Sequence, residues 1–84
     1  MKNLIVVKNN NNETMTIELL LDFKIESIGK EYIVYTINDN DESETVNVII
    51  SEIKYDGEIP VVVPIKEDEK EMVFLFYDRL RKSN

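Results

Sequence analysis

Residues 15–25, MTIELLLDFKI, carry the clearest alternation of apolar and polar side chains in the chain. The apolar positions are Met15, Ile17, Leu19, Leu21, Phe23 and Ile25. Successive side chains of a β-strand point to opposite faces, so this period of two predicts an extended strand with one buried face. Leu20 is the only apolar residue on the opposite face. We therefore expect the six apolar side chains to lie together beneath a covering helix.

Shorter apolar runs on both sides predict further strands. Residues 3–8, NLIVVK, are followed by a polar turn, NNNNE, whose residues tolerate left-handed backbone conformations. Gly29 can supply a positive φ in the turn that precedes residues 30–37, KEYIVYTI. Both faces of that segment are apolar, which is typical of a central strand.

Residues 45–55, TVNVIISEIKY, predict a fourth strand with Val46, Val48 and Ile50 facing inward. Ile53 falls out of this phase, so the pattern predicts a one-residue bulge near Ser51 or Glu52.

A turn and a proline-flanked strand follow. Asp56 and Gly57 predict a two-residue hairpin turn, because a type I′ turn needs positive φ at both central positions. The strand after it, EIPVVVPI, contains Pro60 and Pro64. Proline cannot donate to a strand ladder, so this strand lies at an edge or has the prolines at its ends.

Residues 67–82, EDEKEMVFLFYDRLRK, predict the one helix. Asp68 is the expected N-cap and Glu71 is placed to reach back to it. Acids in the first turn and bases in the last match the helix dipole. At about 100° per residue one face is apolar, while Phe74 and Leu75 lie outside it. That face contains Met72, Val73, Phe76 and Leu80.

These elements predict an α+β fold in a single domain over residues 1–84. We expect an antiparallel meander sheet of about five strands, with the C-terminal helix packed on one face.

Charge and composition exclude several classes of function. The 84-residue chain has a net charge of −7, which disfavours direct binding to nucleic acid or to an anionic membrane. No apolar run is long enough to span a bilayer. The chain has no cysteine, which fits a cytoplasmic location.

The order of the segments resembles the YrzB-like family of small uncharacterised proteins of Firmicutes. The resemblance rests on LIVVK, IELLLDFKIESIGKEYIVYTI, an acidic loop, VNVIISEIKYDGEI and PIKEDEKEMVFLFYDRL, and it covers nearly the whole chain. It implies no established enzymatic activity, cofactor or catalytic residue.

Catalytic and metal chemistry find little support in the residues. The chain has neither histidine nor cysteine, so its serines lack the usual activating base. The loop at residues 38–44 partly matches a calcium loop through Asp39, Asp41, Ser43 and Glu44. It lacks the required glycine and the bidentate glutamate, so we expect a solvated hairpin tip. We therefore expect no cofactor and no metal, and an enzyme with a carboxylate pair ranks last.

A non-enzymatic protein-binding or adaptor role remains. The candidate partner-binding residues are Phe74 and Leu75 on the helix with Leu20 and Ile49 on the sheet, where Ile33 and Tyr35 would share the face away from the helix. The candidate acidic rim is Glu67, Asp68, Glu69 and Glu71. Such a surface suits a basic protein or a second copy of the chain. Two alternatives remain open, namely incidental exposure of these apolar residues and an acidic mimic of nucleic acid.

Overall fold

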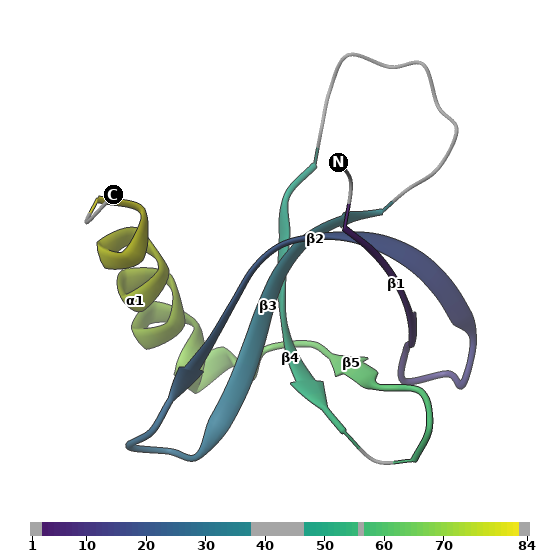
Figure 1. The fold of residues 1–84 in the computed structure, drawn as a ribbon. Helices are drawn as coiled ribbons and strands as arrows, with labels where there is room; N and C mark the ends of the chain where they lie inside the picture. The colour runs from purple at the N-terminus through teal and green to yellow at the C-terminus, as the bar shows by residue number, and fades with distance from the viewer. Residues whose placement is uncertain (1–2, 38–46, 56, 83–84) are drawn as a thin grey trace.

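The computed structural model describes residues 3–37, 47–55 and 57–82, and it shows a five-stranded barrel with a helix at its side (Figure 1). The strands are β1 (Leu4–Lys8), β2 (Thr14–Ile25), β3 (Lys30–Ile37), β4 (Ile49–Lys54) and β5 (Val61–Val63). A 3₁₀ turn, η1 (Glu67–Glu69), leads into the helix α1 (Lys70–Lys82). The α+β class and the C-terminal helix are confirmed.

The sheet closes, and this corrects the expected open meander. Neighbouring strands pair antiparallel from β1 to β5, and β5 then pairs with β1 in parallel. The closing contact is short, with Lys8 opposite Val61 and the Lys8 N–H donating to the Pro60 carbonyl at 2.9 Å. Closure encloses one face of the sheet in the barrel interior, so the apolar side chains on that face need no covering helix.

A bulge in β2 divides the alternating stretch between two cores. Leu19 lies opposite Tyr35 and Leu21 lies opposite Val34, so Leu20 is the extra residue. Opposed residues of an antiparallel pair share a face of the sheet. Leu19 therefore shares the face of Tyr35, and Leu21 shares the opposite face with Val34. The expectation that all six apolar residues lie beneath the helix is therefore wrong.

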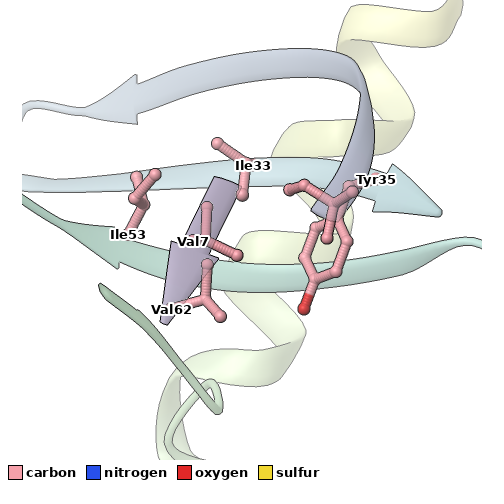
Figure 2. Packing of buried hydrophobic residues seen from close by; sticks show 6 residues of the cluster. Val7, Ile33, Tyr35, Ile53 and Val62 are labelled. Atoms are coloured by element: carbon pink, nitrogen blue, oxygen red, sulfur yellow. The ribbon is translucent and has the colours of Figure 1, made fainter. Parts of the chain in front are cut away.

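The first half of β2 faces the barrel interior. Figure 2 shows side chains from β1, β3, β4 and β5 meeting inside the barrel. The buried cluster consists of Val7, Ile17, Ile33, Tyr35, Ile53 and Val62. Ile5, Met15, Leu19 and Ile49 pack against it and are partly buried. This barrel core is the larger of the two.

The second half of β2 faces the helix. The buried residues of the cluster between β2 and the helix are Ile25, Tyr32, Ile65 and Val73, with Phe23, Ile50, Met72 and Phe76 packed around them. This helix core lies on the outer surface of the barrel. The central strand β3 contributes to both cores, which explains why both its faces are apolar.

Two of the predicted turns have the left-handed backbone conformation that their residues tolerate. Asn12 and Gly29 adopt positive φ values of 66° and 64°. Before Asn12, the Asn9 side-chain oxygen accepts hydrogen bonds from the N–H groups of Asn11 and Glu13 at 2.9 and 3.0 Å. The polar turn expected between the first two strands is confirmed.

The β3–β4 register is continuous over all its pairs, so no bulge occurs at Ser51 or Glu52. Ile49, Ser51 and Ile53 are the residues of β4 on the barrel side, so Ile49 lies away from the helix and Ile53 out of phase with Ile50, as expected. Ile50 packs in the helix core, and Val48 is exposed. Val46 lies outside the described residues.

The β4–β5 connection is also longer than expected. Its last pair is Lys54 with Val61, so the paired strands are not joined by the two-residue turn that the sequence predicted. Gly57 has a φ of 96°, and Asp56 lies outside the described residues. Pro60 and Pro64 flank β5, as expected for residues that cannot donate to a ladder.

Candidate interaction site on the terminal helix

One face of α1 is fixed against the barrel by aromatic and aliphatic packing. Val73 is fully buried, and Met72 and Phe76 pack beside it. The Phe23 ring stacks on both Phe76 and Tyr32, with centroid distances of 5.3 and 5.6 Å. These contacts confirm the predicted apolar face at Met72, Val73 and Phe76, and they determine which of the neighbouring helix residues point into solvent.

Phe74 and Leu75 are the large apolar residues that this packing leaves exposed. Their relative exposures are 49% and 58%, although they neighbour the fully buried Val73 in sequence. The helical rotation of about 100° per residue turns both side chains away from the helix core. The structure therefore supports the expected exposure of this helix pair.

The start of the helix differs from expectation. Lys66 occupies the cap position before η1 and makes no side-chain cap hydrogen bond. The Glu69 N–H donates to the Lys66 carbonyl at 2.9 Å, so a 3₁₀ turn satisfies part of the helix start. Asp68 lies inside this turn, which is why it cannot act as the N-cap.

A lysine from β3 holds η1 against the barrel. The Lys30 ammonium donates to both carboxylate oxygens of Glu69 at 2.9 Å and lies 3.9 Å from a Glu52 oxygen. The hydrogen bond to Glu69 raises the pKa of Lys30 above its ordinary value. Glu52 is buried, so the nearby ammonium compensates a carboxylate that would be costly in isolation.

Tyr32 lies beside this ionic cluster. Burial raises the pKa of its phenol, and the negative charge of Glu69 adds to the increase. Within the described residues its hydroxyl has no hydrogen-bond partner. Sequence reasoning missed the Lys30–Glu69 contact because 39 positions separate the two residues and no local pattern joins them.

The expected acidic rim is partly neutralised. Glu69 is bound to Lys30, and Glu67 pairs with Lys70 at 3.0 Å. Asp68 and Glu71 are exposed, and the described residues place no ion-pair partner on either of them. The rim therefore offers two available carboxylates on one side of the helix.

These two carboxylates border a shallow groove of about 400 Å³ along α1. The groove is lined by Asp68, Glu71, Met72, Leu75, Phe76 and Arg79. It joins the exposed Leu75 to the outer edge of the helix core. Sequence reasoning sorted these residues into an apolar face and an acidic rim, so it did not identify the groove that combines them.

The sheet residues do not extend the helix surface as expected. Ile33 and Tyr35 are buried inside the barrel, which corrects their placement on an open outer face. Ile49 packs against the same interior cluster. Leu20 is exposed at the bulge in β2, because the extra residue points away from both cores. Phe74 and Leu75 are therefore the central part of the candidate site.

A second depression, of about 440 Å³, lies between the polar β1–β2 turn and β4. Near it the Tyr35 hydroxyl and the Ser51 hydroxyl share a buried hydrogen bond of 2.9 Å. Its walls come from Asn9, Asn10, Asn11, Met15, Tyr35, Ile49, Ile50, Ser51, Val62, Val63 and Pro64. Because no charged side chain lines it, the depression is a weaker candidate than the helix groove.

The acidic loop at residues 38–44 lies outside the described residues, so its behaviour toward calcium stays a prediction. Elsewhere in the described chain, acidic side chains do not gather in threes at metal-binding distance. No helix in the described part of the chain has the length and apolar character needed to cross a membrane.

Comparison with known proteins places the chain in a family. Neither the curated proteins nor the solved structures contain a significant match. The sequence model of one family, described as a protein of unknown function (DUF1292), matches residues 10–82. The narrower YrzB-like resemblance and its link to Firmicutes stay predictions. Because the match spans most of the barrel and all of the described helix, the chain belongs to the DUF1292 family of proteins of unknown function.

Proposed function

We propose that this protein is a non-enzymatic cytosolic interaction module that binds a protein partner through α1. The observation that carries the proposal is the exposure of Phe74 and Leu75 on a helix whose opposite face is packed through Val73, with Met72 and Phe76 partly buried beside it. Covering neighbouring large apolar side chains with a partner removes them from water, and this lowers the free energy of the complex.

The charge around this pair favours a partner with basic residues. Asp68 and Glu71 are exposed on the groove side, and the chain carries a net charge of −7. Complementary charge speeds encounter and selects among partners, while the buried apolar contact supplies most of the affinity. The partner we infer is a protein segment with an apolar anchor flanked by lysine or arginine.

The proposal is tested by replacing the two exposed residues together. Protein captured from the native cytosol by the immobilised chain would be identified, purified and titrated calorimetrically. Phe74→Ser with Leu75→Ser should weaken binding about tenfold or more, because both changes remove apolar contact area. The thermal midpoint should change little, since neither residue is needed in the helix core.

A matched control removes exposed apolar surface elsewhere. Val48 and Tyr55 have relative exposures of 50% and 64% and lie outside α1, so Val48→Ser with Tyr55→Ser should leave the affinity unchanged. Equal losses in both double variants, or a large fall in the thermal midpoint for the helix pair, would refute the proposed site.

An acidic mimic of nucleic acid is the second candidate. Its support is the acid-rich start of the helix, although Lys30 and Lys70 pair with two of the four acids there. A mimic should lose affinity steeply with salt and with Glu67→Gln, Asp68→Asn and Glu69→Gln together. Binding that is indifferent to salt but sensitive to Phe74 would favour the apolar site.

A further inference from the structure

The groove on α1 has the residue spacing of a two-helix seam. Asp68, Met72, Leu75 and Arg79 follow one another at intervals of four, three and four residues. Helices that pack side by side bury residues at these alternating intervals, because the intervals keep one stripe facing the partner. The exposed Leu75 and the partly buried Met72, which also packs on the helix core, form the apolar centre of this stripe, with a charge of opposite sign at each end.

The stripe is complementary to itself when one copy is reversed. A two-fold axis between residues 73 and 74 sets Met72 opposite Leu75 of a second copy, and Leu75 opposite Met72. The same operation sets Asp68 opposite the second copy's Arg79 at both ends of the stripe. A two-fold contact requires a surface that matches its own reversed image, and this stripe meets that requirement.

The two end charges are available for such a contact. Nearby charged residues are paired with residues three positions away, as in Glu67–Lys70 at 3.0 Å and Asp78–Arg81 at 3.1 Å. In the described part of the chain neither Asp68 nor Arg79 takes part in an ion pair. Each end of the stripe therefore presents a charge that a reversed second copy would match.

The position of α1 leaves room for this role. Figure 1 shows the helix at the side of the barrel, starting beside the ends of β2 and β3. Val73 and Phe76 attach the helix to the barrel, while Leu75 is 58% exposed. Overall charge opposes self-association, since each copy carries −7, so docking must rely on the local pairs and the apolar centre.

We propose that the occupant of this groove is α1 of a second copy, which forms an antiparallel helix pair closed by two Asp68–Arg79 ion pairs. The inference goes beyond the proposed function, because it assigns the groove side of the helix to a homodimer, in which a second copy and the protein partner would compete for Leu75 and Asp68. Phe74 lies about 160° around the helix from Met72, so the dimer leaves it available to another partner.

Charge exchange tests the arrangement with the full chain. Asp68→Arg and Arg79→Asp would each be measured alone, mixed in equal amounts, and combined in one chain, by sedimentation equilibrium over a range of concentrations. Each single variant sets like charges opposite each other at both ends, so its dimer should weaken about tenfold or more. Glu58→Arg, an exposed change in the β4–β5 loop, is the matched control and should not weaken the dimer.

The mixture and the combined variant should both recover the wild-type dimerisation constant, because each restores opposite charges across the two-fold axis. Asp68→Arg also lowers the net negative charge, so an effect of overall charge alone would strengthen its dimer. A wild-type chain that stays monomeric at about millimolar concentration, single variants that dimerise normally, or a mixture that fails to recover would each overturn the proposal. If the dimer forms as expected but partner binding does not depend on Phe74, only the proposed function is refuted.

Discussion

Lys30 joins three parts of the molecule that lie far apart in sequence. Its ammonium contacts Glu69 at the start of the helix and approaches Glu52 in β4, while Lys30 itself begins β3. The charged lysine stabilises the folded state through these two carboxylates. Tyr32 depends on the same surroundings, because its buried phenol resists ionisation.

Folding stability should therefore fall in alkaline solution. The pKa values of Lys30 and Tyr32 are both raised in the folded state. A raised pKa gives stability that is complete below the unfolded value, about 10 for both residue types, and is lost as the pH rises through the folded value. Urea unfolding measured from about pH 8 to about pH 11.5, a range that brackets the unfolded pKa values of both residue types, should show this decline.

Two variants separate the contributions. Lys30→Met should lower the urea midpoint at neutral pH, because it leaves the buried Glu52 without its nearby cation, and Lys54→Met is the exposed control. Tyr32→Phe should reduce the alkaline decline without lowering stability at neutral pH, since the hydroxyl has no partner among the described residues. An unchanged pH profile in both variants would contradict this assignment.

The bulge in β2 allows one alternating strand to serve two cores. A regular strand would keep all its apolar residues on one face, whereas the extra Leu20 moves the second half of the pattern to the opposite face. A bulge also increases the local bend and twist, which helps β2 pass from the barrel wall to the surface beneath the helix. Leu20 acts here through its backbone, which forms the bulge, because its side chain is exposed and packs in neither core.

Replacing and deleting Leu20 should consequently have different effects. Leu20→Ser should change the free energy of unfolding by only about 0.5 kcal/mol, as for other exposed positions. Deleting the residue removes the bend between the two cores and should approach the cost of Ile17→Ala, about 2–5 kcal/mol. Urea unfolding of the three variants compares them directly, and equal small effects for replacement and deletion would show that the bulge is dispensable.

The complete fold combines a closed barrel with a helix attached through one cluster. Strands β2 and β3 border both cores, so their separation would disrupt the whole molecule. The helix depends on Val73, Met72 and Phe76 in its first two turns, while its last turn is held by Asp78 ion pairs within the helix. Exposed ion pairs of this kind contribute little stability.

Hydrogen exchange should follow this division. Backbone amides paired between β2 and β3 should exchange most slowly, and amides in the last turn of α1 should exchange fastest among the regular elements. Val73→Ala should speed exchange throughout α1 while leaving the barrel-core amides of β1 and β2 nearly unchanged. Uniform acceleration across the chain would instead show that the helix and the barrel open together.

The amino-acid sequence alone determined the α+β class, the long extended stretch, the central strand, the positive-φ turn residues and the exposed pair Phe74 and Leu75. These features follow from local periodicity and backbone sterics, which act over a few residues. Only the tertiary structure decided barrel closure, the bulge at Leu20, the Lys30–Glu69 contact and the groove on α1. Each of these depends on residues brought together from distant positions, and an alternating pattern does not specify whether its apolar face meets a helix or the inside of a closed sheet.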